Sequence, residues 1–284
     1  MFVNNTYAVT VQIGGIMMKN IAFIGAGSMA EAIISGWVQN GSFEKENIYV
    51  KNRSDINRLL SLKETYGVQI LTDLEKLQKM DLIVLAMKPK DARNAMEAIR
   101  PYIGNETKIL SVLAGISIKT ITDGLGMRPV ARVMPNTSAT IGMSASGISF
   151  NELVDDETKQ IFLNLLQAIG IVIEVEEDQL HAITALSGSG PAYIYYLIEA
   201  FEQVGTQYGL PKEVVRNLMV QTVAGSASML SLGKDEPAEL RRKVTSPGGT
   251  TEAGIRALDQ NQFKETIAAC VESAEKRSRE LANG

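Results

Sequence analysis

The fold is decided by ten residues near the start of the chain, Ile21-Ala22-Phe23-Ile24-Gly25-Ala26-Gly27-Ser28-Met29-Ala30. The first four are apolar, which predicts a buried strand, and the next six form a G-x-G-x-x-A turn that opens a helical pattern. The glycines allow a tight turn and the close approach of a pyrophosphate, while a small residue at position 30 lets the helix pack on the strand. A strand before the turn and a helix after it together indicate a dinucleotide-binding domain.

Short apolar runs alternate with amphipathic patterns from residue 19 to residue 134. Strands are predicted over residues 20–24, 48–51, 68–70, 81–86, 108–112 and 129–134. Helices are predicted over residues 29–39, 56–65, 74–79, 92–99 and 118–125, and residues 151–173 add one more helix and a strand. Alternation at this spacing predicts an α/β fold, a Rossmann-type doubly wound parallel sheet with helices on both faces.

Strand signals end after residue 176, and long helices are predicted over residues 192–208, 212–232 and 263–281. An apolar stripe of Met219, Val223, Ala227 and Leu230 follows the second of these helices. The stripe is either core within the chain or a surface for dimerisation, and the sequence supports both readings. The predicted domains are an extension at 1–17, a dinucleotide-binding domain at 18–176, and an all-helical dimerisation and substrate domain at 177–284.

The composition of the chain excludes several classes of functional site. The 284 residues carry a net charge of -4 and contain a single cysteine, Cys270, and a single histidine, His181. This charge argues against a nucleic-acid surface, and no apolar run reaches membrane-spanning length. One cysteine and one histidine argue against disulfides within the chain, a metal site and a Ser-His-Asp triad. We therefore expect a metal-free cytoplasmic protein whose chemistry works almost without histidine and cysteine.

The first seventeen residues lack the basic start and long apolar core of a signal peptide. Gly14-Gly15 precedes Met17 and Met18, and two glycine codons can form a purine-rich ribosome-binding site. We therefore expect natural translation to start at Met17 or Met18, which N-terminal sequencing would contradict by finding Met1. A genuine disordered or edge-strand extension is the alternative.

Several strand ends are expected to line a cofactor crevice. The second strand is followed by Asn52, Arg53 and Ser54 in place of the usual acidic residue, which suits the 2′-phosphate of NADPH. A plain solvated charge is the alternative for Arg53, and Asp55 leaves NADH use open. The fourth strand exits through residues 86–89, Ala-Met-Lys-Pro, with a plain loop lysine as the alternative for Lys88. Small and amide residues after the fifth and sixth strands fit beside a nicotinamide ring, although Asn136 after a proline is equally typical of a turn.

A second glycine-rich segment reads Thr245-Ser246-Pro247-Gly248-Gly249-Thr250-Thr251 and precedes a helical pattern. Unpaired N–H groups and the positive dipole end of a helix start suit a carboxylate or phosphate. The alternatives are a Ser-Pro turn with an ordinary N-cap, and a purely structural capping role for Thr251. A further Gly/Ser segment, residues 187–193, is predicted to be a turn that joins the domains and lines the cleft.

These motifs together resemble the pyrroline-5-carboxylate reductase family over residues 19–281, most specifically along residues 240–259. The resemblance implies hydride transfer from NADPH, or from NADH, to the C=N bond of 1-pyrroline-5-carboxylate, which gives L-proline. The rivals are a related reductase of another cyclic imine or a 3-hydroxy acid, and a non-catalytic nucleotide-binding paralogue. The resemblance also implies interlocked dimers, often five to a decamer, in which each site joins one chain's nucleotide domain to its partner's 245–251 loop.

The resemblance assigns residues 24–29 and 86–89 to the cofactor and residues 244–251 to the substrate, and the pattern at the other strand exits adds the remaining cofactor residues. The expected cofactor-binding residues are Ile24, Gly25, Ala26, Gly27, Ser28, Met29, Asn52, Arg53, Ser54, Ala86, Met87, Lys88, Pro89, Ala114 and Asn136. The expected substrate-binding residues are Val244, Ser246, Gly248, Gly249, Thr250 and Thr251. Thr251 is the expected catalytic residue, a donor to the ring nitrogen, and backbone at 248–250 holds the carboxylate. Asp73 and Glu252 depart from the family pattern, and neither is expected to touch the core chemistry.

Overall fold

The computed structural model describes residues 18–283, so the expectation about residues 1–17 lies outside the described residues. The described chain divides into two compact units, residues 18–189 with 274–283, and residues 190–273. The predicted domain boundary after residue 176 stays a prediction. The structure carries the first compact unit on to residue 189, because the short helix α6 (Leu180–Ile183) packs on the sheet.

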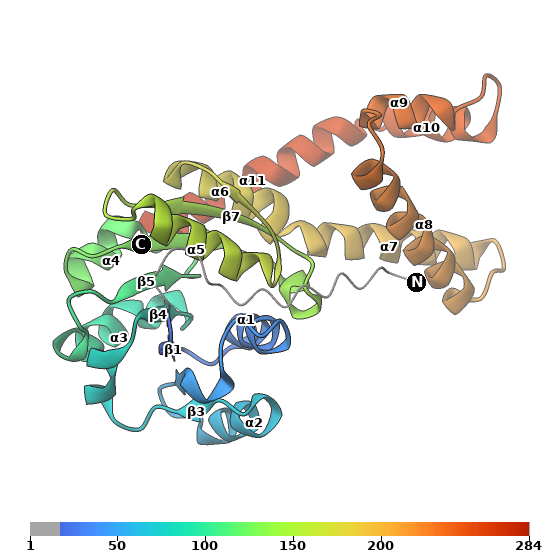
Figure 1. Cartoon of the computed structure of the whole chain (residues 1–284). Helices are drawn as coiled ribbons and strands as arrows, with labels where there is room; N and C mark the ends of the chain where they lie inside the picture. Colours follow the sequence, from blue (N-terminus) through green and yellow to red (C-terminus); the bar gives the residue numbers. More distant parts are fainter. Residues whose placement is uncertain (1–17, 284) are drawn as a thin grey trace. The chain divides into compact units, whose positions relative to one another are not determined.

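The first unit is built on one eight-stranded sheet in the order β3-β2-β1-β4-β5-β6-β7-β8 (Figure 1). Its strands are β1 (Ile21–Ile24), β2 (Ile48–Lys51), β3 (Gln69–Ile70), β4 (Leu82–Leu85), β5 (Lys108–Ser111), β6 (Val130–Met134), β7 (Ser144–Phe150) and β8 (Gly170–Glu174). The first six strands are parallel, as predicted, with Ile24 level with Lys51 and Leu85 at their carboxyl ends. This register brings the exits of β1, β2 and β4 to one edge of the sheet.

Strand β7 is absent from the sequence prediction, and it makes the sheet mixed. It runs antiparallel to β6, and β8 runs parallel to β7. Its residues Ser-Ala-Ser-Gly-Ile-Ser-Phe give a weak apolar alternation, which explains the omission. The small residues are needed because α6 covers this strand: a β-carbon at Gly147 would lie 3.0 Å from the Ile183 side chain.

Helices cover both faces of the sheet. On one face, α1 (Ser28–Gln39), α2 (Ile56–Tyr66) and α5 (Asp156–Gln167) bury the larger hydrophobic core. Trp37 is fully buried at its centre, 5.4 Å from the Phe23 ring and 5.1 Å from the Phe43 ring between centroids. Its indole N–H donates to the Leu165 carbonyl at 2.8 Å, so α1 and α5 are also joined by a buried hydrogen bond.

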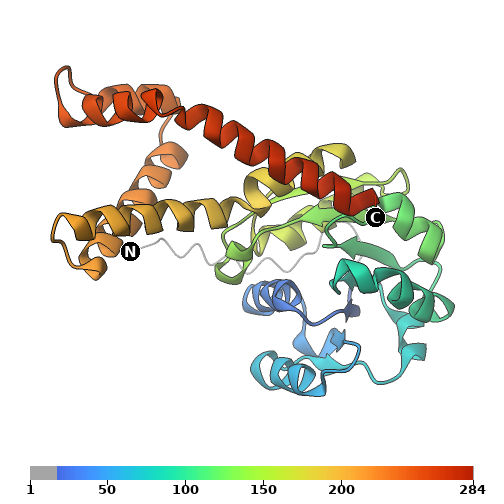
Figure 2. The same cartoon turned by 180° about the vertical axis from the view of Figure 1, so that it is seen from behind.

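The opposite face is covered by α3 (Ala92–Ile99), α4 (Ile118–Leu125) and α6, with a smaller core. The last turns of α11 (Phe263–Asn283) also belong to this unit and lie against it at the C-terminus (Figure 2). A β-carbon at Gly115, in the loop after β5, would lie 2.9 Å from the Leu281 carbonyl oxygen. The chain end is therefore packed directly on a loop at the carboxyl edge of the sheet.

The second unit is helical, as predicted, with α7 (Gly190–Gln207), α8 (Lys212–Leu232), α9 (Pro237–Lys243), α10 (Thr250–Gln260) and the first part of α11. Buried Glu202 of α7 binds Arg216 of α8 at 2.5 Å and Lys212 at 3.3 Å. Among residues 190–273 only Glu202 and Val215 are buried. None of the four residues of the predicted apolar stripe is buried: Met219 and Val223 are half-buried, and Ala227 and Leu230 are exposed, Leu230 to 46%. This pattern favours the dimerisation reading.

The segment that leads from the first unit into the second differs from the predicted turn. Residues 184–188 form a π-helical stretch, η7 (Thr184–Gly188), that leads into α7, so the predicted Gly/Ser turn is helical up to Gly188. Ser187 and Gly188 belong to this stretch and residues 190–193 belong to α7, while Ser189 forms a bend between them, directly before the division between the two compact units. Across residues 18–283, every helix falls short of the length and apolarity that a membrane span requires.

Candidate active site

The turn between β1 and α1 is shaped by Gly25. Its φ of 115° is in the region that favours glycine, and its N–H donates to the Lys51 carbonyl at 2.7 Å. A β-carbon here would lie 2.3 Å from the carbonyl carbon of Ala86 and 2.4 Å from the Met87 nitrogen. The exits of β1, β2 and β4 therefore meet at Gly25, and only glycine permits that approach.

Gly27 occupies the start of α1 and faces open space. It is the N-cap residue with extended backbone and no side-chain cap, and a β-carbon there would meet no atom within 4 Å. Ala30, one turn into the helix, is fully buried against the sheet, as the fingerprint requires. The result is an uncapped helix start beside three strand exits, an arrangement that suits a pyrophosphate.

The residues after β2 lie at the same edge. Asn52 donates from its side-chain nitrogen to the Asp55 carbonyl at 2.7 Å, and Ser54 is exposed. The Arg53 side chain is 86% exposed, and its guanidinium lies 3.4 Å from the Asp91 carboxylate. Asp55 caps α2 by accepting from the Arg58 N–H at 2.9 Å. Arg53 is thus an exposed cation at this exit, and the acidic residue Asp55 already has a structural role.

The remaining predicted cofactor residues are distributed along the other exits. Ala86 and Met87 are half-buried beside Gly25, whereas Lys88 and Pro89 are exposed, and Ala114 is half-buried after β5. Asn136 uses both ends of its amide: the oxygen accepts from the Ser138 N–H at 3.1 Å and the nitrogen donates to the Ser187 carbonyl at 3.0 Å. These contacts agree with the turn-forming alternative for Asn136.

The 245–251 loop lies in the second unit and leads into α10. Gly248 has a φ of 72°, and Gly249 is the N-cap of α10 without a side-chain cap. Thr251 is therefore within the first turn, so the capping alternative does not describe it. Val244, Ser246, Gly248, Thr250 and Thr251 are exposed, and Gly249 is half-buried. The loop presents hydroxyl groups and a glycine backbone at a helix start.

Glu252, one of the two departures from the family pattern, belongs to this loop cluster. Its carboxylate accepts from the Gly248 N–H at 2.9 Å and lies 3.7 Å from the Arg256 guanidinium. The side chain reaches back from the third position of α10 to the N–H of the residue before the N-cap, Gly249. Asp73, the other departure, caps the short helix η2 (Leu74–Lys79) by accepting from the Glu75 N–H at 2.9 Å.

Known proteins match both halves of the chain. A family model described as pyrroline-5-carboxylate reductase dimerisation matches residues 177–281, and one described as NADP oxidoreductase coenzyme F420-dependent matches residues 20–115. Pyrroline-5-carboxylate reductase 2 of Bacillus subtilis (strain 168) is 48% identical over 266 residues, which cover 93% of this chain and 95% of that protein. The chain belongs to the pyrroline-5-carboxylate reductase family.

Solved structures of this family share the fold. A pyrroline-5-carboxylate reductase from Coxiella burnetii superposes with a TM-score of 0.87 at 36% identity, covering 94% of this chain and 99% of that chain. The Plasmodium falciparum pyrroline carboxylate reductase with NADP bound superposes with a TM-score of 0.84 at 29% identity, covering 94% and 100%. The predicted α/β domain followed by a helical dimerisation domain is confirmed.

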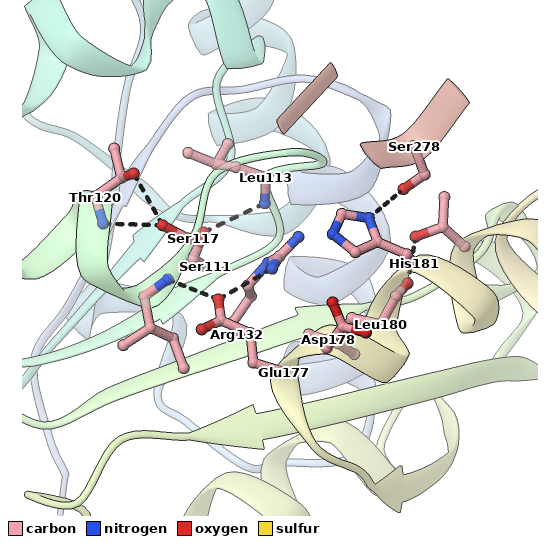
Figure 3. A network of polar contacts seen from close by, with 12 residues as sticks. Ser111, Leu113, Ser117, Thr120, Arg132, Glu177, Asp178, Leu180, His181 and Ser278 are labelled. Atoms are coloured by element: carbon pink, nitrogen blue, oxygen red, sulfur yellow. Dashed lines mark hydrogen bonds and ion pairs between the residues drawn. The ribbon is translucent and has the colours of Figure 1, made fainter. Parts of the chain in front are cut away.

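A polar network around the buried side chain of Arg132 was not predicted from the sequence (Figure 3). Arg132 of β6 is 3% exposed and donates to Glu177 at 3.0 Å; Glu177 also accepts from the Ile118 N–H at 2.7 Å. A buried cation in a strand is paired here by a residue 45 positions away. The pair joins β6, the start of α4 and the segment before α6, which support the strand exits.

His181, the single histidine of the sequence, is part of the packing between α6 and the last turns of α11. His181 of α6 is buried, and its Nδ1 lies 2.9 Å from the Ser278 hydroxyl near the chain end (Figure 3). Burial, then the charges of Arg132 and Arg279, lowers its pKa, against the smaller opposing effects of Asp178 and Glu275. His181 therefore serves packing of the C-terminal turns.

The lowered pKa of His181 predicts a pH dependence of stability. The unfolded chain binds this proton more readily than the folded one, so stability is full above the ordinary value near 6.5 and falls as pH drops below it. The difference in unfolding temperature between pH 7.5 and pH 5.5 should be smaller in a His181→Gln variant than in the wild type. Equal differences would contradict the assignment.

Proposed function

We infer that the chain catalyses the NAD(P)H-dependent reduction of the C=N bond of 1-pyrroline-5-carboxylate to L-proline. The observation that carries this inference is the 48% identity to a pyrroline-5-carboxylate reductase across 95% of that protein. The open helix start at Gly27 and the glycine-threonine loop before α10 support it independently, since a dinucleotide and a carboxylate substrate need two separate anion sites.

The proposed cofactor site is the carboxyl edge of β1, β2 and β4. The 24–29 turn and α1 receive the pyrophosphate, and the 86–89 exit and Ala114 lie toward the ribose and nicotinamide. Arg53 and Asn52 favour the 2′-phosphate, hence NADPH over NADH. Asp55, which left NADH use open in the sequence, is occupied as the cap of α2 and supports the same preference.

The proposed substrate site is the 244–251 segment. Backbone N–H groups at 248–250 are proposed to hold the substrate carboxylate, which would replace the Glu252 carboxylate at the Gly248 N–H and the Ser246 carbonyl at the Gly249 N–H. The Thr251 hydroxyl is proposed to donate to the ring nitrogen. NADPH, when bound, supplies the hydride for the imine carbon. The imine is basic enough to be protonated near neutrality, so the residues need to orient and stabilise it more than to donate a proton. This agrees with a buried, structural His181.

The second unit supports an oligomeric assembly. The match to a dimerisation domain and the exposed apolar side chains of α7 and α8, such as Tyr196 at 76% and Leu218 at 58%, support an oligomer. We further propose interlocked dimers assembled five to a decamer in the cytoplasm, with each 245–251 loop serving the cofactor domain of its partner.

The test is NADPH oxidation with racemic 1-pyrroline-5-carboxylate, run beside other cyclic imines and 3-hydroxy acids. We expect the highest kcat/KM with 1-pyrroline-5-carboxylate. Preference for another imine would favour the related reductase, and no oxidation of either NADPH or NADH with any substrate would favour the non-catalytic paralogue.

Glu252 is expected to weaken substrate binding. Its carboxylate holds the Gly248 N–H that the substrate carboxylate would use, and its charge repels that group. In Glu252→Gln, the KM for 1-pyrroline-5-carboxylate should fall about fivefold, since two like charges near a surface interact by roughly 1 kcal/mol or more. Asp259→Asn, at the other end of α10, removes the same charge and is the control. An unchanged or higher KM in Glu252→Gln would contradict the competition.

A further inference from the structure

The glycine-rich turn is held from outside by a neighbouring helix. Arg58, in the first turn of α2, donates from Nε to the carbonyl oxygen of Ala26 at 2.8 Å. Its side chain is 28% exposed, and its own backbone N–H is fixed by the α2 cap at Asp55. The sequence assigns Arg58 no role, because nothing in the local pattern shows that it reaches residue 26.

This hydrogen bond determines the direction of a second group. The Ala26–Gly27 peptide is planar and trans, so its carbonyl oxygen and its N–H point in opposite directions. With the Ala26 carbonyl directed to Arg58, the Gly27 N–H is directed away from α2. Gly27 is the residue that faces open space at the start of α1. Arg58 thus controls the orientation of the N–H nearest to the proposed pyrophosphate.

The other end of the guanidinium is also fixed. Its Nη2 donates to one Glu31 carboxylate oxygen at 2.5 Å, and the Tyr66 hydroxyl donates to the other at 3.2 Å. Burial and the Glu31 charge raise the pKa of Tyr66, so its hydroxyl stays protonated and remains a donor at neutral pH. The Arg58 guanidinium is therefore held in two directions, by the Ala26 carbonyl in the turn and by Glu31 on α1, which a planar fork permits.

Glu31 gives Arg58 a second task. It lies in the first turn of α1, where a negative charge would oppose an incoming pyrophosphate. The Arg58 cation next to it neutralises that charge. The same guanidinium thus orients a donor toward the anion and removes a repulsion from the helix start.

We propose that Arg58 is a positioning residue for cofactor binding, which acts through the Ala26 carbonyl on the Gly27 N–H and through Glu31 on the charge at the start of α1. The inference rests on the proposed assignment of this turn to the pyrophosphate of NADPH. A purely structural role, joining α2 to α1, would change stability and weaken every ligand of the domain alike.

The test compares two ligands of the purified full-length protein by titration calorimetry. NADP⁺ contains the pyrophosphate, whereas 2′-AMP carries the adenosine and 2′-phosphate without it. In Arg58→Met, we expect the Kd of NADP⁺ to rise at least about tenfold and that of 2′-AMP to change less than twofold. The charge-assisted hydrogen bond to the Ala26 carbonyl is lost, and with it the fixed direction of the Gly27 N–H and the neutralisation of Glu31, both of which matter only to a ligand that contains the pyrophosphate. Lys63→Met, an exposed cation on the same helix, is the control and should leave both constants unchanged.

The double variant Arg58→Met/Glu31→Gln separates the two tasks. It should recover part of the NADP⁺ affinity, because the repulsive charge is gone, while the loss due to the Ala26 carbonyl persists. Arg58→Lys keeps the charge without the fork and should fall between wild type and Arg58→Met, which keeps the test usable if the methionine variant folds poorly. Equal weakening of NADP⁺ and 2′-AMP, or no weakening of either, would overturn the proposal. If instead Gly27→Ala binds NADP⁺ as tightly as the wild type, the assignment of this turn to the cofactor is itself overturned.

Discussion

A Gly25→Ala variant is expected to lose NADPH binding by at least about two orders of magnitude and to unfold at a lower temperature. The β-carbon would lie 2.3 Å from the Ala86 carbonyl carbon, so β1 and β4 must separate where their exits meet. The φ of 115° adds backbone strain to this overlap. A loss of roughly 2 kcal/mol or more of unfolding free energy should accompany the loss of binding, measured by thermal unfolding and NADP⁺ titration.

Gly27→Ala is the matched control for that variant. Its φ is -76° and its β-carbon meets no atom within 4 Å, so the folded chain should keep its stability. The same β-carbon occupies the open space at the start of α1, and NADP⁺ should therefore bind at least about tenfold more weakly. Equal instability of the two variants, or normal NADP⁺ binding by Gly25→Ala, would contradict this account of the turn.

A Thr251→Ala variant is expected to lower kcat about a hundredfold, with a much smaller change in the KM for NADPH. The proposed role of the hydroxyl is donation to the ring nitrogen in the transition state, and the removal of one such donor typically has an effect of this size. The stability of α10 should change little, because Gly249, and not Thr251, is its N-cap. Steady-state kinetics with 1-pyrroline-5-carboxylate measures the effect.

Thr251→Ser provides the counterpart, since it keeps a hydroxyl at the same position. Its kcat should stay within about tenfold of the wild type, clearly above that of the alanine variant. If alanine and wild type turn over equally fast, the hydroxyl has no role in the reaction. If serine and alanine are equally slow, the methyl group matters and the hydroxyl does not.

Elements with strong local patterns were predictable from the sequence. Residues 48–51, 92–99, 118–125 and 212–232 form elements with the predicted bounds. Their apolar residues recur at the strand or helix period, so packing and local preference agree. The turn at residues 25–30 was predictable for the same reason, since its glycines meet a backbone requirement that the neighbouring strand and helix impose.

Features that depend on distant residues were not predictable. Strand β7 has weak local signals and exists because β6 and α6 pack against it. The contact of Arg58 with Ala26 joins residues 32 positions apart, and Arg132 pairs with Glu177 across 45 positions. Glu252 was read as a departure from a family pattern, whereas its hydrogen bond to Gly248 places it in the loop. The spacing of apolar residues along a helix or strand shows which face a residue occupies. It does not show which residue from a distant part of the chain will contact that face.

The central claim is that this chain transfers hydride from NADPH to the imine carbon of 1-pyrroline-5-carboxylate. The most direct measurement supplies NADPH doubly deuterated at C4 with racemic substrate and analyses the product by mass spectrometry. We predict proline carrying one deuterium at C5, formed quickly by the wild type and far more slowly by Thr251→Ala. Absence of deuterated proline with the wild type, from either deuterated NADPH or deuterated NADH, would contradict the claim.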